Sequence, residues 1–269
     1  MASVSRPEPM EGVGMELVRE WAPDAKPRAI IVLVHGLGEH SGRYERIGDQ
    51  FAEAGYFVRA FDLIGFGGTG GRRADIDDWS RYHDQIQRHM EWAKGQGAPV
   101  VLFGFSMGGN LALGYTLGER PGPDLLVLSA PALDGGAAWQ KGIAPIAAKL
   151  APTVRIPNGF KGEWFSRDPA VGEAYFADPL VETKSSTRLG NALFGAMTSV
   201  TQELDRLETP TLVLHGGLDP IVPPQSTAIL GELEGVERRL LPDLRHEVFN
   251  EPEGPEVLEE VIAWIDARI

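Results

Sequence analysis

The chain has 269 residues, of which 43% are hydrophobic and 23% charged, and this composition is typical of one large globular domain rather than two. A formal net charge of −13 argues against nucleic acid as a partner, because binding phosphate groups requires a positive field. The sequence contains no cysteine, which excludes disulfides, thiolate metal sites and a cysteine nucleophile.

The first dozen residues contain Pro7 and Pro9 and lack the apolar segment of a signal peptide, so we expect a loose N-terminus. No stretch of the sequence approaches the roughly 20 apolar residues that are needed to span a membrane. Together these two features predict a soluble, cytoplasmic protein.

Short apolar runs then alternate with longer amphipathic segments, which is the pattern of a mostly parallel sheet flanked by helices. Buried strands are predicted for the apolar runs at residues 29–34, 56–61, 100–103, 125–128 and 211–214. A helix between the second and third runs is indicated by the stripe of Trp79, Tyr82, Ile86, Met90 and Ala93. A C-terminal helix is indicated by Val257, Val261, Trp264 and Ile265. The predicted fold class is α/β.

Residues 104–108, with the sequence Gly-Phe-Ser-Met-Gly, lie between the third predicted strand and a predicted helix at residues 109–117. A serine on so sharp a turn from strand to helix is presented for attack. Its flanking glycines, Gly104 and Gly108, are needed because a larger side chain would clash where the backbones pass. The pentapeptide alone has little specificity, so the flanking strand and helix carry the prediction that Ser106 is a nucleophile.

The alternation of strands and helices stops after Pro131. The following residues, 132–190, are rich in glycine and proline and contain no convincing strand, and a compact domain rarely tolerates so much irregular chain without a purpose. We interpret them as a cap, or lid, inserted into a single domain that spans residues 1–269. The cap also differs in charge, because it holds seven Lys/Arg and six Asp/Glu, against 18 and 32 in the rest of the chain.

Within the cap, an apolar stripe has the spacing of a helix and consists of Trp139, Ile143, Ile146, Ala147 and Leu150, although Pro145 should kink or split such a helix. Residues 135–161 around it contain four Lys/Arg and no acidic residue. Two interpretations remain. The stripe packs on the core with its lysines in solvent, or it makes a peripheral contact with a membrane or micelle surface whose anionic head groups attract the lysines.

A serine nucleophile needs a base, and His246 is the best candidate among the six histidines. It lies in a loop between the apolar pair at 240–241 and the last predicted helix, where its side chain can reach the carboxyl edge of the sheet. His35 fits a structural or oxyanion-loop role, and His40 lies in the loop that follows. His83 and His89 are six residues apart on one helix and therefore do not share a face, and His215 ends a strand.

The base must be held in the tautomer that presents a free nitrogen to Ser106, and a carboxylate on its other ring nitrogen does this. Asp219 follows the last predicted strand of the sheet, so it lies at the same edge as Ser106. Asp243 is closer to His246 in sequence, and Asp219 could instead cap a helix that starts near Pro224. We favour Asp219 because the chain order serine, aspartate, histidine is the one that this architecture uses.

Acyl transfer also requires donors for the oxyanion. The backbone N–H of Met107 is one candidate, because it follows the nucleophile at a helix N-terminus. The second donor should come from the glycine-rich loop after the first buried strand, residues 35–40, in which we choose the N–H of Leu37.

Six motifs together resemble the α/β-hydrolase superfamily and, within it, the monoacylglycerol lipase family, over roughly residues 11 to 269. They lie at residues 35–44, 104–109, 128–132, 166–169 together with 178–180, 214–223 and 246–251. The resemblance implies an α/β-hydrolase fold with a cap over an acyl-chain tunnel. Carried over by position, it implies the roles already given to Ser106, Asp219, His246, Leu37 and Met107.

The role of two charged residues in the first motif is open, and two other segments differ from the family pattern. Glu39 and Arg43 either order the oxyanion loop or the glycerol end of the site, or are ordinary surface charges. Phe105 stands where the family usually has histidine, and residues 62–69 replace polar groups of the usual Asp-His-Arg-Gly-His-Gly-x-Ser segment with apolar ones. These changes affect the surroundings of the triad rather than the triad itself.

The resemblance implies a serine carboxylester hydrolase that cleaves monoacylglycerols, its lipid substrate, to fatty acid and glycerol through an acyl-enzyme. Related alternatives are a lysophospholipase and a broad short-chain carboxylesterase. A different class of alternative is a catalytically silent ligand-binding protein of the same fold. Neither a metal nor an organic cofactor is expected, because no cluster of His, Asp and Glu has ligand spacing.

Overall fold

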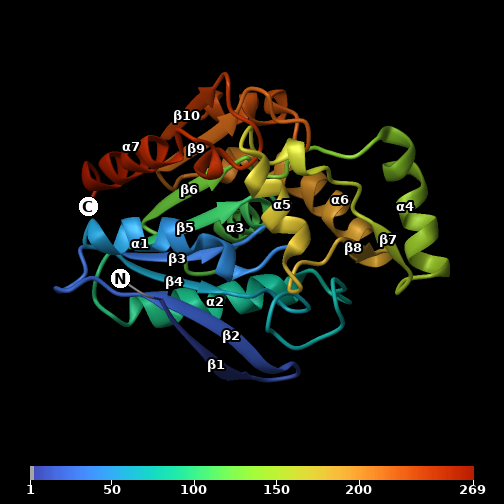
Figure 1. The fold of residues 1–269 in the computed structure, drawn as a ribbon, viewed down its shortest axis with the longest axis horizontal. Coiled ribbons are helices and arrows are strands. Elements are labelled where there is room, and N and C mark those ends of the chain that lie inside the picture. The colour runs from blue at the N-terminus through green and yellow to red at the C-terminus, as the bar shows by residue number, and fades with distance from the viewer. Residues whose placement is uncertain (1–2) are drawn as a thin grey trace.

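The computed structural model describes residues 3–269, in which an eight-stranded sheet has the order β1-β2-β4-β3-β5-β6-β9-β10 (Figure 1). The strands are β1 (Val4–Met10), β2 (Gly14–Trp21), β3 (Ile30–Val34), β4 (Phe57–Phe61), β5 (Val100–Phe105), β6 (Leu125–Ser129), β9 (Thr211–Gly216) and β10 (Val236–Leu241). The pairs β1·β2 and β2·β4 are antiparallel, and the others are parallel. The five predicted strands are confirmed, and so is the mostly parallel sheet.

Helices cover both faces of the sheet. They are α1 (Glu45–Glu53), α2 (Ser80–Lys94), α3 (Met107–Leu117), α4 (Ala138–Leu150), α5 (Pro169–Ala177), α6 (Thr187–Gln202) and α7 (Gly254–Asp266). Short 3-10 helices occur at Ser41–Tyr44, Gly162–Trp164, Leu204–Arg206, Pro224–Glu232 and Val248–Asn250. Helices α2, α3 and α6 share one apolar core with the sheet, and α1 and α7 share the other.

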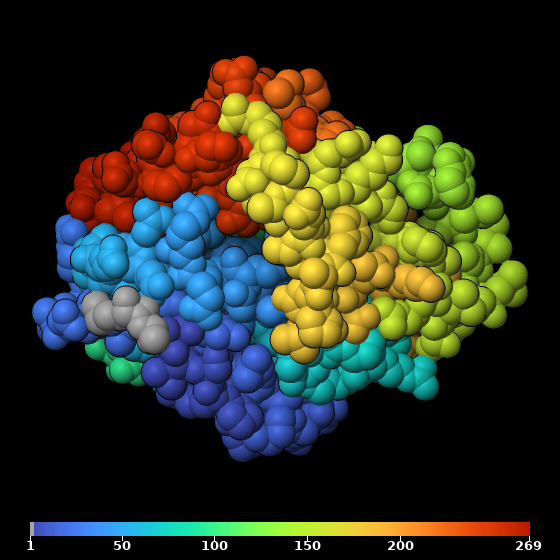
Figure 2. Space-filling model, viewed as in Figure 1, coloured from blue at the N-terminus to red at the C-terminus, as the bar shows by residue number. Residues whose placement is uncertain are grey.

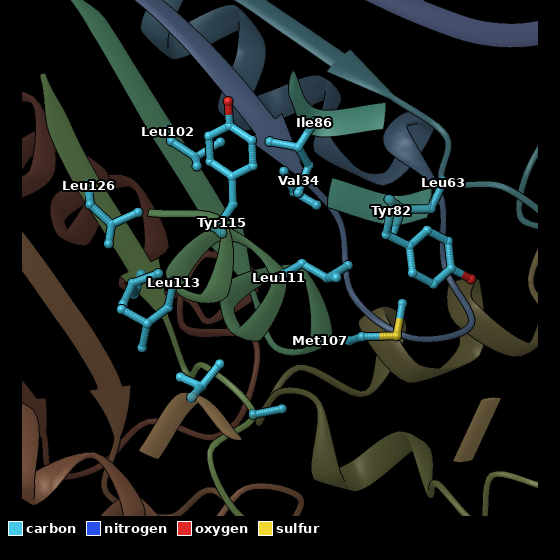
Figure 3. Close-up of a cluster of buried hydrophobic side chains, with 14 of the residues drawn as sticks. Val34, Leu63, Tyr82, Ile86, Leu102, Met107, Leu111, Leu113, Tyr115 and Leu126 are labelled. Atoms are coloured by element: carbon cyan, nitrogen blue, oxygen red, sulfur yellow. The ribbon is translucent and has the colours of Figure 1, made fainter. Parts of the chain in front are cut away.

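Alternate side chains of each central strand enter these two cores. Val32 packs with the α3 side and Leu33 with the α7 side, as expected for strands that are buried on both faces. Figure 3 shows part of the first core, where Leu111 and Leu113 of α3 lie among side chains that include Leu126 of β6 and Ile86 of α2. This packing fixes α3, and with it the turn at the end of β5.

The N-terminus differs from the expectation of a loose segment, because β1 pairs with β2 along its whole length. Pro7 and Pro9 are tolerated because β1 is an edge strand, where a missing N–H need not disrupt a ladder. The hairpin is also fixed by charge, since the buried Arg59 of β4 forms ion pairs with Glu8 of β1 and Glu20 of β2.

The cap segment, residues 132–190, leaves the sheet after β6 and returns through α6 (Figure 1). It contains two short strands that the sequence did not predict, β7 (Arg155–Pro157) and β8 (Lys184–Ser186), which pair with each other. The sequence predicted a kink or a split at Pro145; α4 is a single element that continues through this residue, so this fully described helix is not split. In Figure 2 the cap forms one end of the molecule, with α4 at its outer edge. Among residues 3–269, no helix has the length and apolar character required to cross a membrane.

Candidate active site

Ser106 occupies the turn between β5 and α3 and has an unusual backbone conformation, with φ 53° and ψ −117°. A non-glycine residue with positive φ is strained, and such strain persists only where surrounding structure imposes it. Here the Ser106 N–H donates to the Ser129 carbonyl of β6 at 3.0 Å. Its own carbonyl accepts from the N–H groups of Asn110 and Ala132, each at 3.0 Å. Three segments therefore hold the serine on the turn.

The two glycines that flank the turn are required by close backbone packing, as predicted. A β-carbon on Gly108 would overlap the carbonyl oxygens of Val34 and His35, and one on Gly104 would overlap the Gly108 carbonyl. The residue spacing of the pentapeptide thus reflects a place where β3, β5 and α3 meet without room for a side chain.

The structure brings Ser106, His246 and Asp219 together from three separate loops. The Nε2 atom of His246 lies 3.0 Å from the Ser106 Oγ, and its Nδ1 atom lies 2.6 Å from the Asp219 Oδ2. All three residues are buried. Asp243, the alternative partner, is exposed. The arrangement can transfer a proton from a serine hydroxyl to a histidine whose tautomer is fixed by a carboxylate.

Asp219 also has partners that the sequence did not reveal. Its Oδ1 accepts from the N–H groups of Ile221 and Val222, at 2.8 and 3.0 Å. Both lie before the 3-10 helix at Pro224–Glu232, whose N-cap is Pro223 and which receives no side-chain cap, so the helix-capping interpretation is wrong. His215 lies 3.2 Å from its Oδ2. Burial alone would raise the pKa of Asp219, but His246, His215 and the backbone donors lower it far below its usual value. Asp219 is therefore ionised.

His246 experiences the opposite balance. Burial favours its neutral form, but the Asp219 carboxylate, followed by the carboxyl groups of Glu247 and Glu39, outweighs burial and raises the pKa of His246 above its ordinary value. The ring of Phe105 lies against the imidazole, with centroids 4.8 Å apart. The apolar residue that departs from the family pattern therefore forms one wall around the candidate base.

Leu37 and Met107, whose backbone N–H groups are the predicted oxyanion donors, both line the cavity beside Ser106. Neither N–H donates to another of the residues that the structure describes. Met107 is the first residue of α3, where unpaired N–H groups and the helix dipole favour negative charge. Both groups are thus unpaired among the described residues, and their role as oxyanion donors stays a prediction.

Glu39 is buried and the side chain of Arg43 is only 10% exposed, so neither is an ordinary surface charge. Glu39 accepts from the N–H of Gly36 at 2.6 Å, which fixes the loop that carries Leu37. Arg43 binds Glu39 at 3.0 Å and also binds both carboxylate oxygens of Glu247, each at 2.8 Å. Sequence reasoning missed Glu247, and its only local signal was its position next to His246.

The remaining histidines near the site have other partners. His35 is buried, accepts from the Leu63 N–H through Nε2 and lies 2.8 Å from the Gly36 carbonyl through Nδ1, so its role is structural. His40 binds Asp178 of the cap at 2.8 Å. In the same region the Glu182 N–H donates to the Gly38 carbonyl at 2.7 Å. The cap is therefore attached directly to the loop that carries Leu37.

A cavity of about 240 Å³ begins at Ser106 and is lined mainly by apolar side chains of α4 and α6. Its lining includes Trp139, Ile143, Ala147, Phe194 and Met197. A second pocket of only about 10 Å³ also reaches Ser106, and its lining includes Phe105, His246, Phe165, Tyr175, Glu39 and Glu247. Within residues 3–269, no group of His, Asp and Glu side chains is arranged to hold a metal ion.

The sequence matches the family model described as serine aminopeptidase S33 over residues 25–253. It is 37% identical over 268 residues to a protein named monoacylglycerol lipase from Mycolicibacterium smegmatis, and the match covers 95% of each chain. It is 31% identical to phospholipase YtpA of Bacillus subtilis, over 93% of this chain and 99% of that protein.

The structure also superposes on a soluble variant of the monoglyceride lipase of Saccharomyces cerevisiae in complex with a substrate analogue. The TM-score is 0.91 at 22% identity, and the match covers 100% of this chain and 96% of that chain. This last likeness establishes the fold alone. The chain belongs to the serine aminopeptidase S33 family of α/β-hydrolases and is a lipolytic serine hydrolase of the lipase and esterase kind.

Proposed function

We propose that the protein cleaves monoacylglycerols to fatty acid and glycerol through an acyl-enzyme, with residues 132–190 acting as a cap over the acyl chain. The observation that carries this proposal is the hydrogen-bonded chain of Ser106, His246 and Asp219 beside an apolar cavity. The mycobacterial relative named monoacylglycerol lipase supports the choice of substrate.

In the proposed mechanism, the Ser106 Oγ attacks the ester carbonyl carbon while its proton passes to His246 Nε2. The carbonyl oxygen becomes an oxyanion that accepts from the N–H groups of Leu37 and Met107. Collapse of this intermediate breaks the bond to the glycerol oxygen, which takes the proton from His246. Water then attacks the acyl-enzyme by the same route, so that fatty acid leaves and Ser106 is restored. Asp219 stabilises the imidazolium throughout.

The unequal sizes of the two pockets that reach Ser106 support a substrate with one acyl chain and a small alcohol. The large cavity is apolar, whereas the small pocket contains the carboxyl groups of Glu39 and Glu247. Hydroxyl groups can donate to such carboxylates. A phosphate head group would instead meet two acidic side chains that share a single arginine, Arg43, and this disfavours a lysophospholipid.

Product analysis tests the proposal. The purified protein is incubated with mono-, di- and triacylglycerols, lysophosphatidylcholine and p-nitrophenyl butyrate, beside Ser106→Ala and the exposed-site control Ser199→Ala. We expect fatty acid mainly from monoacylglycerol, loss of this product in Ser106→Ala, and no change in Ser199→Ala. Preferred release from lysophosphatidylcholine, or turnover of the short nitrophenyl ester alone, would replace monoacylglycerol with one of the alternative substrates.

We further propose that the outer face of α4 contacts the lipid surface from which the substrate is drawn. Trp139, Ile143, Ile146 and Leu150 are 70%, 55%, 59% and 79% exposed, so the stripe does not pack on the core. Trp139 and Ile143 also line the cavity, whereas Ile146 and Leu150 do not, so the last two define the outer face. Lys149 on the same helix forms no ion pair with any described residue and is available to anionic head groups.

Co-sedimentation with vesicles tests this contact. We expect binding to vesicles that contain anionic lipid, weaker binding by Leu150→Ser and Ile146→Ser, and no loss in the control Ile229→Ser, whose exposed isoleucine lies outside the cap. Binding that is insensitive to anionic lipid contradicts the electrostatic part of the proposal. Equal binding by the cap variants and the control contradicts the apolar part.

A further inference from the structure

One face of α6 forms a wall of the large cavity. The α6 residues on this wall are Thr187, Gly190, Asn191, Leu193, Phe194 and Met197. They recur at helical spacing, so they lie on one side of the helix. Gly190 is the position in this set that carries no side chain, and the cavity is correspondingly open beside it.

The glycines of the cavity wall differ in what requires them. Gly135 and Gly136 have positive φ, and a β-carbon on Gly136 would lie 2.9 Å from the Phe194 ring. Their backbone conformation therefore favours glycine. Gly190 has an ordinary helical conformation, and a β-carbon there would meet no heavy atom of the described residues within 4 Å. Neither conformation nor packing requires glycine at this position.

Gly195 is the matched comparison on the same helix. A β-carbon there would also meet nothing within 4 Å among residues 3–269, but Gly195 is exposed and does not line the cavity. Substitution at either position replaces a poor helix former, so both changes should favour the helix to a similar extent. They differ only in where the new side chain points.

We propose that Gly190 determines which acyl chains the protein accepts, because its missing side chain keeps the cavity between α4 and α6 wide enough for a long chain. The inference rests on the proposed ester hydrolysis but not on the choice of glycerol as the alcohol. A side chain at Gly190 would take up part of the cavity volume, and a long acyl chain needs more of that volume than a short one does.

The test is a chain-length profile with p-nitrophenyl butyrate and p-nitrophenyl palmitate, on the unaltered protein, Gly190→Ala, Gly190→Leu and Gly195→Leu. We expect Gly190→Leu to lower kcat/KM for the palmitate ester by ~10-fold or more while the butyrate ester is unchanged. Gly190→Ala should show a smaller loss, and Gly195→Leu should match the unaltered protein. Thermal unfolding of each variant verifies that it is folded.

Binding provides a readout that does not depend on turnover. In a Ser106→Ala background, Gly190→Leu should weaken the binding of a fluorescent hexadecanoic acid analogue relative to Gly195→Leu. The inference is wrong if Gly190→Leu lowers kcat/KM for both esters by the same factor. It is also wrong if this variant binds the analogue as well as Gly195→Leu does, or if the unaltered protein does not hydrolyse the palmitate ester. Hydrolysis of both nitrophenyl esters without hydrolysis of monoacylglycerol would contradict the proposed function and leave this inference standing.

Discussion

Helices α3 and α4 both border the large cavity and both are rich in apolar residues, yet their environments are opposite. Nine of the eleven residues of α3 are buried, whereas none of the thirteen residues of α4, all of them described by the structure, is buried. The apolar residues of α3 are explained by folding, because they fill the core beneath the sheet. Those of α4 contribute little to the core, and some of them instead line the cavity.

Replacing a glycine in each helix should give the largest difference between α3 and α4, and this difference is in activity. A β-carbon at Gly108 of α3 overlaps the backbone that leads to Leu37, so Gly108→Ala should displace an oxyanion donor and lower kcat/KM on the order of 10²- to 10³-fold. Gly142 of α4 has open space, so Gly142→Ala should keep activity and stabilise the protein by up to about 1 kcal/mol. For each variant, hydrolysis of p-nitrophenyl butyrate measures activity and thermal unfolding measures stability. Retained activity in Gly108→Ala would show that the turn can relax.

Truncating a large side chain should lower the free energy of unfolding much more in α3 than in α4. Leu111 of α3 is fully buried, and Leu111→Ala should cost about 2 to 5 kcal/mol in the free energy of unfolding. Ile143→Ala in the exposed α4 should change it by no more than about 0.5 kcal/mol. Urea denaturation followed by circular dichroism gives both values. A cost at Ile143 equal to that at Leu111 would mean that α4 belongs to the folding core.

The smallest expected effect concerns pH. His246 acts as a base only when neutral, so its raised pKa places the acid limb of kcat/KM at higher pH than for a free histidine. Asp219, Glu247 and Glu39 all raise this pKa, and Glu247→Gln removes one of them, so the limb should move to lower pH. Asp134→Asn, beside Lys141 of α4, should leave the limb in place. A full pH profile of each variant is the measurement, and an unmoved limb in Glu247→Gln contradicts the assignment.

The central strands and the serine turn could be predicted because their signals are local. A strand buried on both faces is a continuous apolar run, and the close packing around Gly104 and Gly108 leaves a fixed spacing in the sequence. The meeting of Asp219 with His246 was predictable only through chain order at a shared sheet edge. The structure supplies the distances that this reasoning could not.

The elements that were missed depend on partners far away in sequence. Strand β1 is fixed by Arg59, about fifty residues along the chain, and its own prolines argue against a strand. The charge of Arg43 is matched by Glu247, which no local pattern reveals. For α4, periodicity identified an apolar face correctly but could not say what covers that face.

The strained conformation of Ser106 has a consequence for evolution in the laboratory. A non-glycine residue held at positive φ costs of order 1 to 3 kcal/mol, and β6, α3 and the start of the cap together impose it. Glycine would adopt the same backbone without that cost. Selection of random variants for thermal stability alone would therefore favour Ser106→Gly, and would enrich molecules that have lost the proposed nucleophile.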